Sequence, residues 1–157
     1  MKVFDSLKKK AEESKKVIVF PEGNDDRIIK AAVRLEKEGI VKPLLLGKPD
    51  EVIETAQSLN VDLGSIEIIN PAVYPDFEKM CQDFIELRKG KNTLAEAKKI
   101  LQDVSYFGTM LVYEGKADGM VSGATHSTAN TVRPALQIIK TKKGMSRVSG
   151  AMIMERG

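Results

Sequence analysis

The sequence has few of the residues on which several kinds of site depend. Its 157 residues include one cysteine, one histidine and no tryptophan, and aromatic residues make up only 5%. A single cysteine, Cys81, excludes an intrachain disulfide and a cysteine-rich zinc site. One histidine without clustered acids makes a metal centre unexpected. So few aromatic side chains provide no stacking platform for single-stranded nucleic acid, so no nucleic-acid partner is expected.

Long apolar runs and a strong charge of one sign are also lacking. The chain is 42% hydrophobic and 30% charged, with a net charge of +3, as expected for one globular domain. Residues 1–16 alternate Phe4, Leu7 and Ala11 with charged side chains, which is unlike a signal peptide or a membrane span. We therefore expect a soluble, cytoplasmic protein without a membrane partner. Cys81, among apolar neighbours, is expected to be a core thiol.

Short apolar runs alternate with helical patterns along the chain. Strands are expected at 17–20, 41–47, 66–69 and near Gly119. Helices are expected from Asn24 to Gly39 and from Pro49, then over 75–89, 93–103 and 104–114, and finally in a segment that carries Val132 to Ile139. This alternation, with several continuously apolar strands, predicts an α/β fold: a mainly parallel sheet with helices on both faces. Acidic Glu22, Asp25 and Asp26 stand where they would favour a helix start.

The segment from Ala117 to Pro134 has the chemistry of an anion pocket. Met120 and Val121 are expected to end a buried strand, and Arg133 to lie in the first turn of the following helix. Backbone N–H groups at that helix start, short hydroxyl side chains and a guanidinium would converge on one ligand, phosphate or a phosphorylated molecule. The apolar side of this helix is expected to comprise Val132, Leu136, Ile138 and Ile139.

The same pattern has a purely structural interpretation. Thr128 or Asn130 would cap the helix, Pro134 would be a first-turn proline, and Arg133 would be solvated. The pattern alone supports both interpretations equally. The number of hydroxyl groups exceeds what one cap needs and favours an anion site; they belong to Ser122, Thr125, Ser127, Thr128 and Thr131.

Other candidate groups are less specific. The loops 21–24 and 122–131 are expected to face one crevice, because ligands of parallel sheets lie beyond the carboxyl ends of the strands. His126 lies in the second loop and could serve as an acid, a base or a hydrogen-bond donor, although a lone loop histidine is more often none of these. Arg88 is expected in the last turn of its helix, where its interaction with the helix dipole is sufficient explanation. Residues Arg147 to Glu155 are expected to begin a new strand.

Segment 118–141, which reads Asp-Gly-Met-Val-Ser-Gly-Ala-Thr-His-Ser-Thr-Ala-Asn-Thr-Val-Arg-Pro-Ala-Leu-Gln-Ile-Ile-Lys-Thr, closely resembles phosphate acetyltransferases. Segments 21–27 and 86–89 resemble the same family, in the same order along the chain. The motif of segment 118–141 would also be expected, in a looser form, in the related phosphate butyryltransferases. The resemblance implies reversible transfer of acetyl between coenzyme A and phosphate in a ternary complex, without a metal or a cofactor, coenzyme A being a substrate. It also implies a homodimer of two-domain subunits with the fold of isocitrate and isopropylmalate dehydrogenases.

The resemblance assigns roles to several residues. Arg133, Ser127 and Thr128 would act on phosphate or the acyl group, and Arg88 would bind the substrate anion. Ser122 and Thr131 are further substrate-binding candidates among the hydroxyl groups.

The chain is shorter than the resemblance would require. Family members are roughly twice as long as one ordinary domain, and their later motifs, which supply a catalytic serine, another arginine and an aspartate base, have no counterpart here. We expect a first domain over residues 1–145 and the truncated start of a second over 146–157, with little or no activity from this chain alone. Alternatives are a non-catalytic phosphate- or coenzyme-binding module, a phosphate butyryltransferase and, third, an oxidoreductase, for which a nicotinamide motif is lacking.

Overall fold

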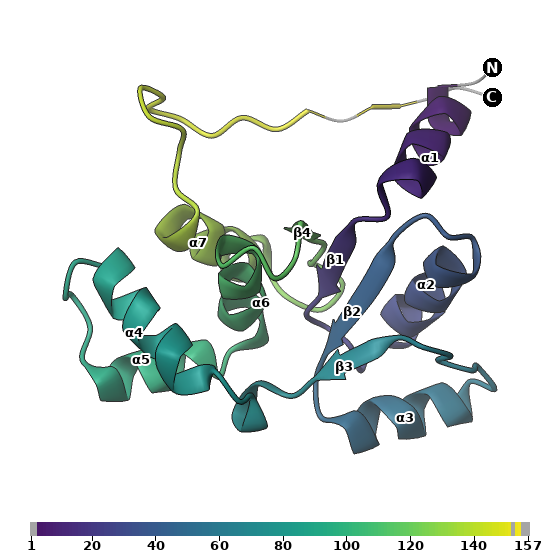
Figure 1. Ribbon diagram of the computed structural model, residues 1–157, viewed down its shortest axis with the longest axis horizontal. Coiled ribbons are helices and arrows are strands. Elements are labelled where there is room, and N and C mark those ends of the chain that lie inside the picture. Colours follow the sequence, from purple (N-terminus) through teal and green to yellow (C-terminus); the bar gives the residue numbers. More distant parts are fainter. Residues whose placement is uncertain (1–2, 152, 155–157) are drawn as a thin grey trace.

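A four-stranded parallel sheet forms the centre of the molecule. The computed structural model describes residues 3–151, 153 and 154, and its strands run in the order β3-β2-β1-β4 (Figure 1). They are β1 (Val17–Phe20), β2 (Lys42–Leu46), β3 (Glu67–Ile69) and β4 (Gly119–Met120). The predicted α/β fold with a parallel sheet is confirmed.

Alternate residues of the two central strands enter two separate cores. Val19 of β1 pairs in register with Leu44 of β2 and with Met120 of β4. Val19 and Leu44 belong to one buried cluster, whereas Phe20 and Leu45 belong to the other. Because both faces of the sheet are covered, these strands are apolar at every position after the exposed Lys42 that opens β2, and they show no alternation.

Helices cover both faces, as Figure 1 shows. On one side lie α2 (Asp26–Lys37) and α3 (Pro49–Ser58), which bury Ile29 and Val52 against the sheet. On the other lie α4 (Phe77–Leu87), α5 (Leu94–Leu101), α6 (Val104–Tyr113) and α7 (Thr128–Ile138). Their core includes Phe84 and Phe107, and also Cys81, whose predicted place in the core is confirmed.

Local sequence sets several helix boundaries. Asp25, not Asn24, is the N-cap of α2, since its carboxylate accepts from the backbone N–H of Arg27. A capping box opens α5: Thr93 accepts from the N–H of Glu96, and the Glu96 carboxylate accepts from the N–H of Thr93. The short 3-10 helix η1 (Pro71–Val73) links β3 to α4.

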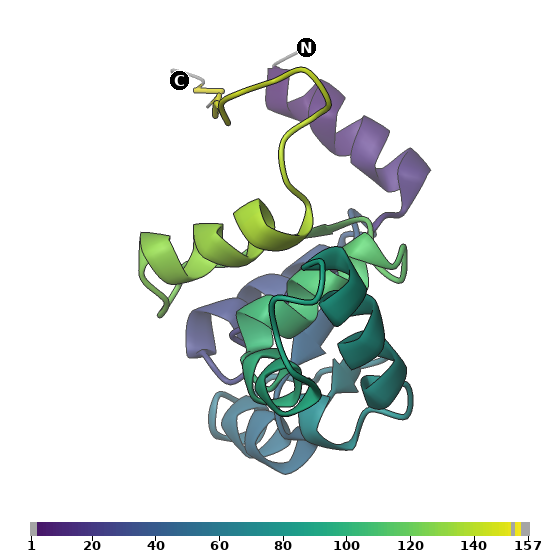
Figure 2. The same ribbon diagram turned by 90° about the vertical axis from the view of Figure 1, so that its left-hand side faces the viewer.

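The two ends of the described chain lie away from the sheet. Helix α1 (Val3–Ser14) buries no residue and projects from the rest of the fold (Figure 2). The strand expected from Arg147 to Glu155 is not formed by 147–151, 153 or 154; residues 152 and 155 lie outside the described part. Figure 1 shows this segment running clear of the sheet, and a strand needs a neighbour with which to share backbone hydrogen bonds.

No helix within residues 3–151 is long and apolar enough to cross a membrane.

Candidate anion-binding site

The carboxyl ends of the strands enclose a cavity of about 520 Å³. Pro21, Glu22 and Asn24 line it from the loop after β1, and Thr125 and His126 line it from the loop after β4. The predicted meeting of these two loops in one crevice is therefore confirmed.

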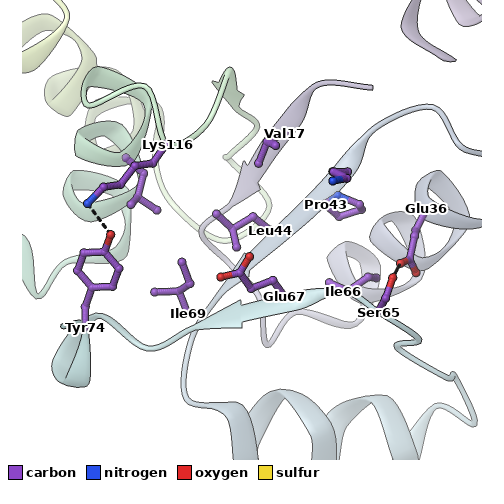
Figure 3. A pocket seen from close by; sticks show the side chains of 12 residues that line it. Val17, Glu36, Pro43, Leu44, Ser65, Ile66, Glu67, Ile69, Tyr74 and Lys116 are labelled. Carbon is purple, nitrogen blue, oxygen red and sulfur yellow. Dashed lines mark hydrogen bonds between the residues drawn. The ribbon is translucent and has the colours of Figure 1, made fainter. Parts of the chain in front are cut away.

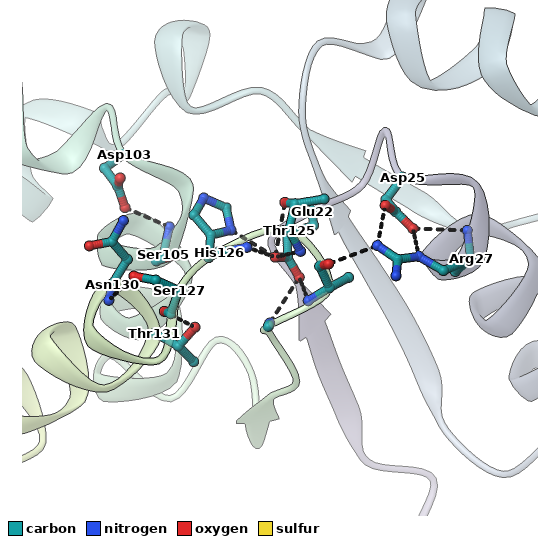
Figure 4. A network of polar contacts seen from close by, with 12 residues as sticks. Glu22, Asp25, Arg27, Asp103, Ser105, Thr125, His126, Ser127, Asn130 and Thr131 are labelled. Atoms are coloured by element: carbon teal, nitrogen blue, oxygen red, sulfur yellow. Dashed lines mark hydrogen bonds and ion pairs between the residues drawn. The ribbon is translucent and has the colours of Figure 1, made fainter.

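Glu22 joins the two loops through six hydrogen bonds (Figure 4). Its Oε2 accepts from the backbone N–H groups of Gly123 and Ala124 at 3.0 and 2.9 Å. Its Oε1 accepts from the N–H groups of Thr125 and His126 at 2.7 and 2.8 Å. The Thr125 hydroxyl, at 3.1 Å, and His126 Nδ1, at 2.8 Å, complete the shell around Oε1. The loop thus binds an anion, and this anion is a side chain of the protein.

The surroundings of Glu22 keep it ionised. Its side chain is only 1% exposed, and burial alone would raise its pKa. The backbone hydrogen bonds from Thr125, His126 and Ala124 outweigh that effect and lower the pKa of Glu22 to about 2. The expectation that Glu22 favours the start of α2 is wrong, because its carboxylate points to a loop that the sequence places far away.

Arg27 holds the same loop from outside. Its guanidinium donates to the carbonyl oxygen of Ala124 at 2.7 Å and also pairs with Asp25 at 2.9 Å. Both Asp25 and Arg27 are on or next to α2. The loop after β4 is therefore tied twice to the segment 22–27.

The hydroxyl side chains at the start of α7 have different roles. Ser127 is the N-cap and accepts from the N–H of Asn130 at 3.3 Å, so neither Thr128 nor Asn130 caps the helix. Thr131 donates to the Ser127 carbonyl at 3.2 Å. Thr128 is exposed, whereas the Ser122 hydroxyl is buried without a hydrogen-bond partner among the described residues.

Helix α7 begins earlier than the sequence pattern indicated. With Ser127 as its cap, Arg133 lies in the second turn and Pro134 lies inside the helix, buried. The predictions of a first-turn arginine and a first-turn proline are both wrong. Because proline has no backbone N–H, Pro134 cannot make the helical hydrogen bond to the carbonyl oxygen of Asn130, one turn earlier.

The apolar side of α7 is only partly buried. Ile138 is 1% exposed, but Val132, Leu136 and Ile139 are 41%, 50% and 47% exposed. At positions i, i+4 and i+7 these three share one face of the helix, which we call the α7 stripe. Val121 is also 54% exposed and follows β4, so it does not belong to a buried strand.

Arg88 and Arg133 each act electrostatically on Tyr106. Arg88 is the C-cap of α4, and Lys140, just after α7, donates to the neighbouring Leu87 carbonyl at 3.1 Å. Burial raises the pKa of Tyr106, and the positive charges of Arg133 and Arg88 act on it in the opposite direction. Both guanidinium groups therefore lie within electrostatic range of one phenol.

Both arginines have capacity left for a ligand. Arg133 is exposed and has no ion pair with any acid in the described ranges. Arg88 is half-buried, and its Nε is buried without a hydrogen-bond partner there. The Tyr106 hydroxyl instead donates to Gln137 of α7 at 3.1 Å.

A second cavity, of about 480 Å³, lies at the opposite ends of the strands (Figure 3). Two lysines line it, Lys42 and Lys116, and Lys116 already donates to the Tyr74 hydroxyl at 2.7 Å and pairs with Glu114 at 3.0 Å. These bonds, with one to Asp76, raise the pKa of Lys116 although burial acts against them. Because Lys116 is already paired and the carboxylates of Glu36 and Glu67 also line this cavity, it is a weaker candidate for binding an anion.

Sequence reasoning missed two residues of the site. Glu22 was expected at a helix start, and Tyr106 was given no role. A buried carboxylate partner could have been suspected from the loop 122–127, since so many adjacent N–H groups need an acceptor. No signal in the sequence marks Tyr106, because the residues around it come from α4 and α7, which are separate in the sequence from its own helix α6.

The fold and site define a class of protein: an α/β domain with an anion-holding loop at the carboxyl edge of a parallel sheet, where such folds place their ligand sites. Residues 2–157 match the family described as phosphate acetyl/butaryl transferase. The chain belongs to this family.

Similar proteins agree with this assignment. The phosphate acetyltransferase of Bacillus subtilis (strain 168) is 49% identical over 155 residues, which are 99% of this chain and 48% of that protein. That of Staphylococcus aureus (strain MRSA252) is 54% identical over 89% of this chain and 43% of its own length. A Streptococcus pyogenes phosphotransacetylase structure superposes with a TM-score of 0.89 at 54% identity, covering 94% of this chain and 46% of that one.

The EutD phosphotransacetylase of Staphylococcus aureus superposes with a TM-score of 0.86 at 52% identity, over 91% of this chain and 43% of that one. The chain thus spans a little under half the length of the relatives that it matches.

Proposed function

We propose that this chain carries one wall of a phosphate acetyltransferase active site, with Arg133 and Arg88 as the groups that bind phosphate or acetyl phosphate. The observation that carries this proposal is their common neighbourhood. Two guanidinium groups lie in electrostatic range of Tyr106, and no acid among the described residues pairs with either. Two unpaired cations on a folded surface favour binding of an anion between them.

In the proposed reaction one bond to the acetyl carbonyl carbon forms and one breaks. An oxygen of hydrogen phosphate attacks the carbonyl carbon of acetyl-coenzyme A, the C–O bond forms, the C–S bond breaks, and the proton of the phosphate passes to the sulfur, so that coenzyme A leaves as the thiol. In reverse, the sulfur attacks the carbonyl carbon of acetyl phosphate, the C–S bond forms, the C–O bond breaks, and the thiol proton passes to the departing phosphate. Arg133 and Arg88 would hold the phosphoryl oxygens, and Thr128, exposed on the first turn of α7, would donate a hydrogen bond to the same group.

The other hydroxyl groups fit this arrangement to different degrees. The Ser127 and Thr131 hydroxyl groups already form hydrogen bonds within the first turn of α7. We propose that both also contact the ligand, so that each hydroxyl group would be shared between α7 and the ligand. Ser122, buried without a partner in the described part, would reach only a ligand that enters the loop.

The active protein would contain more than this chain. Transfer to a thiol needs a base and stabilisation of the carbonyl oxygen, and loss of one such stabilising donor costs roughly 10²–10³ in rate. We propose that a second domain, beginning near residue 146, supplies these groups, that the complete enzyme is a cytoplasmic homodimer, and that this chain alone is inactive or nearly so. The alternatives are a phosphate butyryltransferase and a non-catalytic phosphate- or coenzyme-binding module.

Isothermal titration of this chain with inorganic phosphate tests the anion site. We expect Arg133→Ala and Arg88→Ala each to weaken binding about tenfold or more, since a charge-assisted hydrogen bond contributes roughly 1.5–3 kcal/mol. Lys143→Ala, which removes an exposed cation beyond the end of α7, is the matched control. Equal affinities for all four proteins would reject the assignment.

An assay of acetyl and butyryl transfer in the longer protein that contains this chain separates the alternatives. A rate with acetyl phosphate well above that with butyryl phosphate supports the proposal. A preference for butyryl phosphate favours the butyryltransferase, and phosphate binding without transfer favours the non-catalytic module.

A further inference from the structure

The loop after β4 forms an anion-binding nest that the protein fills itself. Four consecutive backbone N–H groups, from Gly123 to His126, point at the carboxylate of Glu22. Converging N–H groups of this kind make a concave site for an anion. Here each of the four lies between 2.7 and 3.0 Å from a carboxylate oxygen, so none is left for a ligand.

A ligand phosphate would have to displace Glu22 to use these N–H groups. The displaced carboxylate, 1% exposed in its present place, would lose all six hydrogen bonds. Leaving a buried charge without donors is strongly unfavourable. An incoming phosphate is therefore left with donors outside the nest, among them Thr128 and Arg133, which α7 exposes.

The same carboxylate fixes the ring of His126. An ionised carboxylate only accepts hydrogen bonds, and the low pKa of Glu22 keeps it ionised. His126 Nδ1, at 2.8 Å from Oε1, must then carry a hydrogen atom. In the neutral ring Nε2 is left without one, as an acceptor on the edge away from Glu22, and the residue lines the 520 Å³ cavity (Figure 4).

We propose that Glu22 is a positioning residue of the substrate site. Its carboxylate takes the place of a bound anion in the nest 123–126, fixes the His126 ring as its Nδ1–H tautomer, and confines the ligand phosphate to Thr128 and Arg133 on α7. Only the last element, the place of the phosphate, rests on the proposed function. The nest and the tautomer are testable without any enzymatic assay.

Chemical rescue tests the nest. Glu22→Ala removes a CH₂ group and a carboxylate, for which acetate is a close match in size and charge. We expect the variant to unfold at a lower temperature than the wild type and to regain stability with acetate in a saturable manner. Sodium chloride at equal ionic strength should not replace acetate, and the wild type should gain little. Equal responses of the two proteins to acetate would overturn the proposal.

The tautomer supplies a test that needs no variant and remains available if Glu22→Ala does not fold. Since the chain has one histidine, a long-range ¹H–¹⁵N spectrum contains a single imidazole. At alkaline pH we expect Nδ1 to have the chemical shift of a protonated nitrogen and Nε2 that of an unprotonated one. The opposite tautomer, or a rapid average of the two, would overturn the proposal.

Titration of the ¹⁵N-labelled wild type with inorganic phosphate tests where the ligand goes. We expect shifts at the amides of residues 128–133 that saturate, with much smaller changes at 123–126. Saturable shifts centred on 123–126 would overturn the proposal while leaving phosphate binding intact. Rescue by acetate without any phosphate response would instead reject the proposed function and retain the nest.

Discussion

Glu22 and His126 are 104 positions apart in the sequence, yet Glu22 Oε1 lies 2.8 Å from His126 Nδ1. The contact exists because β1 and β4 are parallel neighbours in the sheet. The residues that follow two such strands emerge at the same edge, and one loop there supplies a carboxylate to the N–H groups of the other.

This contact predicts a specific dependence of stability on pH. The pKa of Glu22 is lowered from 4.5 to about 2, so its ionised form stabilises the fold fully above the higher value. That contribution is lost as the pH falls from 4.5 toward 2, and the shift corresponds to roughly 3 kcal/mol. Glu22→Gln should therefore be much less stable than the wild type near neutral pH, with the gap narrowing in acid.

Urea denaturation of both proteins from about pH 6 to about pH 3 measures this gap. A difference in unfolding free energy that stays constant over the whole range would contradict the role of the Glu22 charge.

Gly23 is needed because the chain after β1 passes close to the end of β2. A Cβ atom at this position would lie 2.5 Å from the carbonyl oxygen of Leu46, and the Gly23 N–H donates to that same oxygen at 3.1 Å. Backbone atoms on both sides would have to move, so we expect Gly23→Ala to destabilise the fold by about 2 kcal/mol or more. Gly150→Ala, where a Cβ meets nothing within 4 Å, is the control in thermal and urea unfolding; equal stability of the two variants would reject the clash.

Gly108 lets α6 approach the sheet. A Cβ there would lie 2.8 Å from Met120 Sδ, 3.1 Å from Val19 and 3.2 Å from Leu46. Alanine gains up to about 1 kcal/mol in helix propensity, but overpacking costs about 1–3 kcal/mol. Since Val19 and Leu46 are buried in the sheet and only Met120 is flexible, we expect a net loss of about 1 kcal/mol.

Calorimetric unfolding of Gly108→Ala in the wild type and in a Met120→Ala background measures this balance. The loss should be smaller in the second background, where the nearest atom is removed. Equal losses in both would show that Met120 is not the source of the strain.

Ser127 caps the N-terminus of α7, whether or not it also contacts a ligand. Ser127→Ala should cost about 1 kcal/mol of stability by removing the cap on Asn130, whereas Ser127→Asn should retain most of it. If the hydroxyl also contacts phosphate, both variants should bind phosphate more weakly. Phosphate titration and urea unfolding of the two variants separate these effects, and unchanged affinity in both would leave Ser127 as a cap only.

The α7 stripe should contribute little to the stability of this chain. Leu136 is 50% exposed and Ile138 is 1% exposed, although both are apolar residues of the same helix. We expect Leu136→Ser to change the unfolding free energy by less than about 0.5 kcal/mol and Ile138→Ala to lower it by about 2–4 kcal/mol. Similar losses in urea unfolding would indicate that the stripe is covered in solution.

The secondary structure and fold class could be read from the sequence because they depend on neighbouring residues. The apolar runs at 17–20 and 41–47 and the capping box at Thr93 mark their own elements. The sequence-based predictions were wrong where contacts between distant segments determine the structure. The apolar pattern of α7 could not tell which side the core covers, and the expected strand from Arg147 found no neighbour among the described residues.

By itself, the sequence determined an α/β domain with a hydroxyl-rich loop at a strand-to-helix junction, because periodicity and side-chain chemistry are local properties. Only the tertiary structure decided which anion that loop holds. The parallel sheet brings Glu22 under the N–H groups of Gly123 to His126, and packing of α4 and α7 against α6 places Arg88 and Arg133 within electrostatic range of Tyr106. Contacts of this kind depend on how distant segments of the chain pack together, and a local sequence pattern does not predict that packing.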